Sequence, residues 1–187
     1  MNEFEFIFAL FGLLLGLSIT EVLGGLARVI ETRMDRNAAV RIGWLTPLLG
    51  VFVLLDLLSF WIAAWTTRSL IAVSGGSLMA VTCFASAYYL AARLAFPREP
   101  GQMPDLDAHF FAVRRIVLGV MFVLLLCQLG WYASLPRLAP LLLHPLSLAL
   151  TSILVVLMIA AMFVRGELAS RVVMLALVAR YLLVYLL

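Results

Sequence analysis

The sequence predicts an all-α fold, a polytopic membrane helix bundle with six transmembrane helices. Hydrophobic residues occupy 65% of the 187 positions and the mean hydropathy is +1.15, whereas apolar residues make up about 45–50% of an ordinary soluble domain. Six apolar runs reach the length of about 20 residues that a helix needs to cross a hydrocarbon core of about 30 Å. Runs such as 13–15 and 124–126 are apolar on every face, which is the pattern of a helix and not the alternation of a membrane β-barrel.

The six spans follow one another with short connections, and we expect them near 6–27, 43–65, 77–96, 110–132, 141–164 and 168–187. The first span lacks the positively charged start of a signal peptide, so we expect the chain to keep it. The segment 97–105 holds three prolines and a glycine, which end the third span before the fourth begins. Asp105 and Asp107 suit the start of the fourth span, because acids cap the free amides of a helix N-terminus.

Short connections also predict that residues 1–187 form one transmembrane helical domain. The break at 97–105 divides the chain into two halves of three spans, so that any structural repeat between the halves would be inverted, as in many transporters. The sequence support is one repeated pattern. Pro47 is followed by Ile-Ala-Ala at 62–64, and Pro145 is followed by Ile-Ala-Ala at 159–161. In a chain this apolar, chance explains such a repeated pattern more readily than common ancestry of the two halves.

The charges predict the orientation of the bundle. All thirteen basic residues are arginines. Ten of them belong to the first, third and fifth loops or the adjoining helix ends, namely Arg28, Arg33, Arg36, Arg41, Arg93, Arg98, Arg114, Arg115, Arg165 and Arg171. Only Arg68 and Arg137 lie in the other two loops. By the positive-inside rule, both termini lie outside, and we expect a multi-pass protein of a plasma (inner) membrane.

Several classes of partner and chemistry are disfavoured. The net charge of +3 comes without a basic stripe interleaved with aromatic residues, so the expected partner is the lipid bilayer and not a nucleic acid. His144 stands alone, and the run 105–109 is better explained as a helix start than as a metal site. No serine elbow, HExxH motif or lysine is present, so we expect no metal or cofactor, and an enzyme is the less favoured class.

Asp56 and Arg180 are the first candidates for a functional site, because a charge at the bilayer centre is costly. Asp56 interrupts a run of leucines in the second span, and Arg180 lies in the sixth at a similar depth. One interpretation is a structural ion pair that joins these two helices. The alternative is a carboxylate that binds a proton or cation, which requires Arg180 to point elsewhere.

Glu21 is the third candidate, near the inner end of the first span. Small residues recur beside it at Gly12, Gly16, Thr20 and Gly24, a spacing that lets another helix approach closely. Gly25 lies one turn beyond Glu21. We expect these glycines to pack a helix of the same chain, a second copy or a partner membrane subunit. Glu21 either has a functional role or pairs with Arg28 or another inner arginine.

Three function classes follow from these residues. The most concrete is a transporter or channel for protons, ions or a small solute that uses the intramembrane carboxylates. A non-catalytic accessory subunit, assembly factor or sensor is the alternative. The third class, an intramembrane enzyme acting on lipids, would use the acids as acid and base, but the sequence supplies no accompanying nucleophile or metal ligands.

Overall fold

The computed structural model describes the chain except residues 1–2, 36–39, 42, 68–73, 103 and 187. Six of its helices are long and apolar enough to cross a membrane: α1 (Glu3–Met34), α2 (Leu45–Thr66), α3 (Gly75–Ala95), α4 (Leu106–Ser134), α6 (Pro145–Phe163) and α7 (Glu167–Leu186). Two short elements, η2 (Pro100–Gln102) and α5 (Ala139–Leu142), lie in the connections. The prediction of an all-α bundle with six candidate spans is confirmed.

Three boundaries differ from the predicted ones by four residues or more, and one of them is the start of α4 at Leu106 in place of 110. Helix α1 continues to Met34, because hydropathy marks where the apolar segment ends and polar residues can extend a helix beyond it. The predicted fifth span, 141–164, begins only at Pro145, with His144 at the N-cap position. Proline is favoured in the first turn of a helix and cannot continue a preceding one, so α5 and α6 are separate helices.

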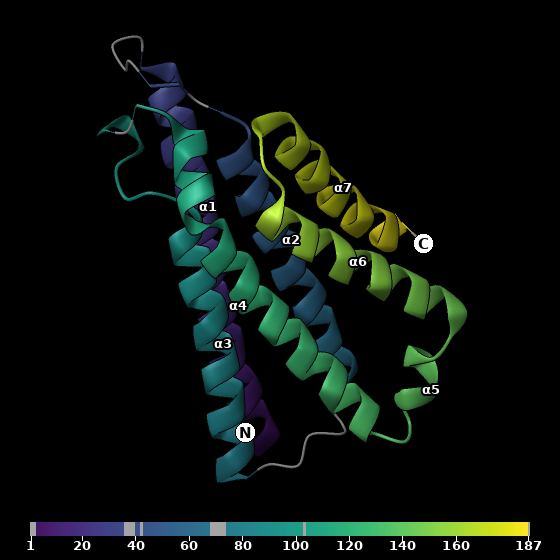
Figure 1. Ribbon diagram of the computed structural model, residues 1–187. Coiled ribbons are helices and arrows are strands. Elements are labelled where there is room, and N and C mark those ends of the chain that lie inside the picture. Colours follow the sequence, from purple (N-terminus) through teal and green to yellow (C-terminus); the bar gives the residue numbers. More distant parts are fainter. Residues whose placement is uncertain (1–2, 36–39, 42, 68–73, 103, 187) are drawn as a thin grey trace.

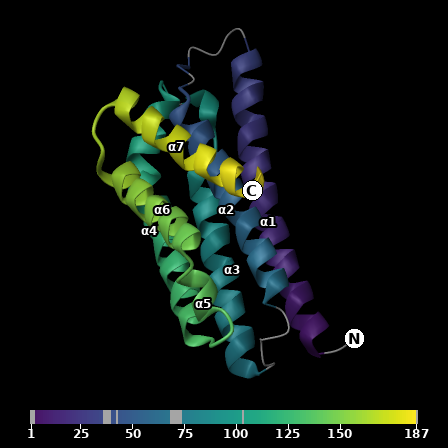
Figure 2. The same ribbon diagram turned by 90° about the vertical axis from the view of Figure 1, so that its right-hand side faces the viewer.

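Helix α2 is the central element of the bundle. It packs against α1, α3, α4 and α7, and α7 crosses it obliquely (Figure 2). Its Leu49, Phe52, Val53 and Leu57 are fully buried. A helix that is apolar on all sides suits this position, and Asp56 is the only charged residue within it.

Helices α1 and α3 lie side by side along the length of the bundle (Figure 1). The ring of Phe96, which follows α3, lies against Gly25 of α1 and Gly50 of α2, and a Cβ at either glycine would overlap the ring. Three segments therefore meet closely at this point because two of them lack a side chain there.

The two halves of the chain pack differently. Helix α1 runs along α3, whereas the equivalent pair of the second half, α4 and α7, makes no comparable contact. The other two pairs do correspond, since α1 packs on α2 as α4 does on α6, and α2 on α3 as α6 does on α7. The inverted repeat stays a prediction.

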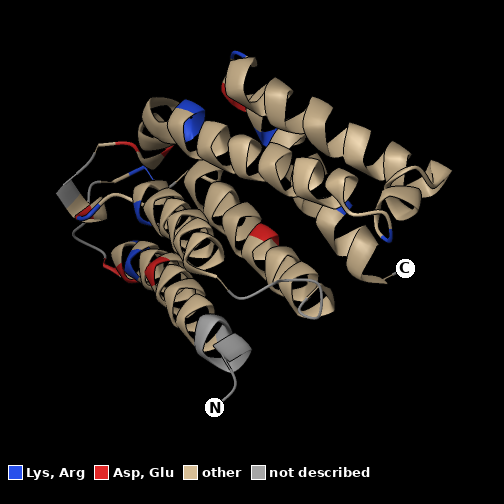
Figure 3. Cartoon of the chain, turned by 90° about the horizontal axis from the view of Figure 1, so that it is seen from below, with Lys and Arg blue, Asp and Glu red and all other residues tan. Residues whose placement is uncertain are grey.

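The surface of the bundle is apolar. Each long helix exposes large hydrophobic side chains, among them Leu13, Ile62, Leu90, Val123, Val156 and Leu175. Most charged residues gather toward one end of the helices (Figure 3). This distribution is that of a multi-pass integral membrane protein whose sides face lipid.

Candidate functional site

The carboxylate of Asp56, a partly buried residue, is the centre of a polar cluster whose other members are buried. Tyr88 of α3 donates its hydroxyl to Oδ2 at 2.6 Å, and Tyr181 of α7 donates its hydroxyl to Oδ1. The two tyrosines are only 3% and 2% exposed. Three helices therefore meet at a single carboxylate, which we call the Asp56 cluster.

Aromatic rings surround this cluster. Phe60 and Phe84 pack on Tyr88, with ring centroids 5.3 and 5.6 Å away. Phe52 meets Tyr181 edge-on at 5.8 Å. These rings supply no hydrogen-bond donors, so the carboxylate depends on the two tyrosine hydroxyls for its hydrogen bonds. A charge shielded from water is costly without such donors.

Arg180 does not pair directly with Asp56. Its Nε donates to the carbonyl of Leu150 in α6 at 3.3 Å, and its guanidinium lies over the Tyr181 ring at 4.9 Å. Consecutive residues of a helix point about 100° apart, so the residue of α7 that faces Asp56 is Tyr181, and Arg180 faces α6. Of the two interpretations drawn from the sequence, the geometry matches the one in which Arg180 points elsewhere.

Glu21 lies in a second, separate polar site between α1 and α3. Arg93 donates Nη1 to its Oε2 at 3.1 Å, and the hydroxyl of Tyr89 lies 3.4 Å from Oε1. The Glu21 and Arg93 side chains are 25% and 32% exposed. The partner is thus an inner arginine, as one interpretation predicted, although it is Arg93 and not Arg28.

The predicted packing glycines divide into two groups. Gly12 contacts Trp61 and Gly25 contacts Phe96, so both serve contacts within the chain. Gly16 has no neighbour within 4 Å of an added Cβ, and Gly24 has only its own helix's Arg28. The regular spacing of small residues therefore does not form a single internal seam.

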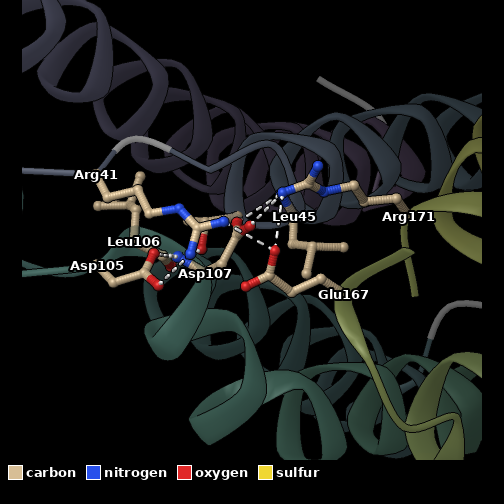
Figure 4. Close-up of polar contacts among 8 residues, drawn as sticks. Arg41, Leu45, Asp105, Leu106, Asp107, Glu167 and Arg171 are labelled. Atoms are coloured by element: carbon tan, nitrogen blue, oxygen red, sulfur yellow. Dashed lines mark hydrogen bonds and ion pairs between the residues drawn. The ribbon is translucent and has the colours of Figure 1, made fainter. Parts of the chain in front are cut away.

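A third polar cluster joins the connections at the end of the bundle that the arginine distribution predicts to be the inner one (Figure 4). Arg41 pairs with Glu167 at 3.0 Å and with Asp105 at 3.7 Å, and Arg171 pairs with Glu167 and Asp107, each at 3.2 Å. The first, third and fifth connections are thereby held together, and we call these five residues the inner network.

Asp107 is the buried member of the inner network, with a side chain 1% exposed. Its Oδ1 accepts the backbone N–H of Leu45 at 2.9 Å, which satisfies a free amide at the start of α2. Gly43 allows this approach, because a Cβ there would overlap the carboxylate. Thr46 adds a hydrogen bond to the Leu106 carbonyl at 2.6 Å.

The predicted helix start at Asp105 is present. Its side chain accepts the Asp107 N–H at 2.9 Å. His109 instead lies 3.2 Å from the Leu94 carbonyl. Among the described residues, no three His, Cys, Asp or Glu side chains converge as metal ligands.

Arg114 is a further buried charge that sequence reasoning did not single out. It is 6% exposed, and its Nη1 donates to the carbonyls of Ala161 and Val164 at 3.3 and 2.6 Å. Its guanidinium lies 4.9 Å from the Phe111 ring centroid. A cation at the C-terminus of α6 satisfies free carbonyls and is favoured by the helix dipole, so its role is structural.

The tyrosines of the Asp56 cluster were also missed, although the sequence carried a signal for them. Tyrosine is enriched at membrane interfaces, yet Tyr88 and Tyr181 lie within spans. A tyrosine at that depth calls for a hydrogen-bond partner, and the nearest candidates are intramembrane acids.

The chain matches no protein-family model, and no similar protein is found among curated proteins or solved structures. Function is therefore inferred from the geometry of these sites.

Proposed function

We propose that this protein is a transporter or channel of a plasma (inner) membrane in which Asp56 binds the proton that is moved or coupled to movement of a small solute. The observation that carries the proposal is the environment of this carboxylate, which accepts hydrogen bonds from two tyrosine hydroxyls, while no guanidinium in the described part of the chain pairs with it. The other predicted carboxylate, Glu21, has an arginine partner.

The depth of Asp56 supports the proposal. It lies eleven residues after Leu45 and ten before Thr66, so each end of α2 is about 15 Å away at 1.5 Å per residue. This position corresponds to the centre of a hydrocarbon core about 30 Å thick. Ionisable residues at that depth are costly to keep and typically mark ion or proton pathways.

The chemistry of the ligands supports proton binding in particular. A tyrosine hydroxyl can donate to a carboxylate and can also accept from a carboxylic acid. Asp56 can therefore gain or lose a proton while Tyr88 and Tyr181 stay hydrogen-bonded to it. A guanidinium partner only donates, and it would favour the ionised form alone.

The inner network fits a gate in such a transporter. Transport through a central site requires that the two ends open at different times. Ion pairs that join the first, third and fifth connections hold the inner end closed. The two pairs that Arg41 makes are surface pairs, with the Arg41 side chain 61% exposed, and such pairs are individually weak, so they can be broken during a transport cycle.

A second candidate function is a non-catalytic membrane subunit, assembly factor or sensor. It is favoured by the Glu21–Arg93 pair, since Glu21 and Asp56 bind different residues and form separate sites. In that case both acids would serve to join helices.

Two measurements on purified protein distinguish these candidates. Infrared spectroscopy should show a protonated carboxyl band that changes with pH and is missing from Asp56→Asn. A pH-sensitive dye in proteoliposomes should report proton flux that Asp56→Asn abolishes. Glu21→Gln is the matched control, because it removes an intramembrane acid outside the Asp56 cluster, and it should retain the band.

Two results would overturn the proposal. One is a wild-type protein whose proton flux does not exceed that of protein-free liposomes. The other is an Asp56→Asn variant with unchanged flux. The first result favours the non-catalytic subunit, and the second assigns proton movement to another residue.

A further inference from the structure

A groove opens toward the membrane between α1 and α3. It has a volume of about 270 Å³ and is lined by Leu14 and Leu17 of α1 and by Ser86, Tyr89 and Leu90 of α3. Leu17 and Leu90 are 47% and 57% exposed. The lining is almost entirely apolar, so the groove can receive a hydrocarbon chain.

The same face of α1 carries charge farther toward the inner end. Positions 14, 17, 21, 24 and 28 are spaced by three or four residues and therefore form one stripe of a helix. Arg28 lies eleven residues beyond Leu17, which is about 16 Å along the helix. Between these two positions, Tyr89 and Arg93 reach Glu21 from α3.

Arg28 is the unsatisfied charge at this end. Its Nε is buried without a hydrogen-bond acceptor, as are those of Arg114 and Arg171. Those two guanidinium groups have other partners, whereas the described hydrogen bonds and ion pairs include none from the Arg28 guanidinium, and the Glu21 carboxylate pairs with Arg93. Its Nη1 lies 3.5 Å from the position that a Gly24 Cβ would take, so the guanidinium rests over a residue without a side chain. Arg28, Arg93 and Glu21 together carry a net charge of +1, and the exposed Glu31 lies one turn beyond Arg28.

We propose that the α1–α3 groove binds an anionic phospholipid of the inner leaflet. One acyl chain lies against Leu14, Leu17 and Leu90, and the phosphate contacts Arg28, with Arg93 as the second cation. A phosphate oxygen would supply the acceptor that Arg28 Nε lacks, because the guanidinium fork matches phosphate geometry. Basic groups between helices on the cytoplasmic side are suited to anionic headgroups.

Native mass spectrometry of the protein released from detergent tests this site. The probes are phosphatidylglycerol and phosphatidylcholine with identical acyl chains, supplied at equal concentration. The wild type should retain phosphatidylglycerol preferentially. Arg28→Gln should reduce that preference roughly tenfold, as expected for loss of a charge-assisted contact.

Two further variants separate the headgroup from the acyl chain. Arg33→Gln is the matched control, because it removes an arginine of the same helix that lies over the Trp44 ring, and it should leave the preference unchanged. Leu17→Trp fills the groove without changing charge and should lower retention of both lipids. Thermal unfolding of each variant in detergent verifies that it is folded.

Three results would overturn the proposal. Equal retention of the two lipids by the wild type would do so, as would a phosphatidylglycerol preference in Arg28→Gln that equals the wild type. The third is a spectrum that shows a dimer and no lipid adduct, with the dimer lost in Gly16→Leu. That result would assign this face to a second copy of the chain. None of these results depends on proton flux, so the lipid site and the proposed function fail independently.

Discussion

Tyr88 and Tyr89 are consecutive residues of α3 that contact carboxylates in two different sites. Tyr88 donates to Asp56 of α2 in the core, and the Tyr89 hydroxyl lies beside Glu21 of α1 in the membrane-facing groove. The rotation of about 100° per residue in a helix separates the two side chains. One turn of α3 thus serves both the proposed proton site and the proposed lipid site.

The two tyrosines should differ in their effect on stability. Tyr88→Phe removes the 2.6 Å hydrogen bond that the buried Tyr88 donates to the partly buried Asp56 carboxylate, and we expect it to lower the free energy of unfolding by about 1–2 kcal/mol. Tyr89→Phe removes a contact of 3.4 Å and should cost less than about 0.6 kcal/mol. Thermal or denaturant unfolding in detergent measures both, and equal losses would contradict the distinction.

Asp56 and Arg180 should be only weakly coupled. Because Arg180 donates to the Leu150 carbonyl and reaches Asp56 through the shared Tyr181, and not through a direct ion pair, the losses of Asp56→Asn and Arg180→Gln should add to within about 1 kcal/mol in the double variant. A double-mutant cycle of unfolding free energies tests this. A coupling above about 1 kcal/mol would restore the structural ion pair as the better interpretation.

Alanine substitutions at two glycines should have opposite effects. Gly50→Ala forces a methyl group into the Phe96 ring and should destabilise the bundle by about 1–3 kcal/mol. Gly16→Ala enters open space and should be neutral or stabilise by up to about 1 kcal/mol, because alanine favours helix more than glycine does. Melting temperatures of the two variants provide the comparison. A Gly50→Ala protein as stable as the wild type would mean that the three segments do not meet closely at Phe96.

The inner network should depend on its buried member. Asp107→Ala leaves the Leu45 N–H without its acceptor and removes one of the two carboxylates that pair with Arg171, so we expect a loss of about 2–3 kcal/mol in unfolding free energy. Arg41→Gln changes a side chain that is 61% exposed and should cost less than about 1 kcal/mol. Chemical denaturation of each variant in detergent measures the two losses. A larger loss for Arg41→Gln than for Asp107→Ala would contradict this ranking.

Reporter fusions test the orientation of the bundle. The ten arginines at the first, third and fifth loops predict that reporters placed within 98–107 and at Glu167 register on the cytoplasmic side, while one at Ser74 registers outside. Alkaline phosphatase and a fluorescent protein, which are active on opposite sides of the membrane, provide the readout. An outside signal from the 98–107 fusion would reverse the assignment and move the proposed lipid site to the outer leaflet.

The sequence by itself determined the class of protein and the number of spans. Burying apolar segments of about 20 residues is so favourable in a bilayer that hydropathy alone located the six helices. It also marked Asp56 and Glu21, because a charge within such a segment stands out. The predicted helix ends were less accurate at α1 and α6. Polar residues continue α1 beyond its apolar segment, and a proline starts α6 later than hydropathy indicates.

The partners of those charges were decided only by the tertiary structure. Asp56 binds Tyr88 and Tyr181, and not Arg180. Depth along a span can be read from residue number, but the face that a residue presents to its neighbours depends on how the helices are rotated and which of them touch. That rotation is set by close packing over the whole bundle, as where Phe96 meets Gly25 and Gly50.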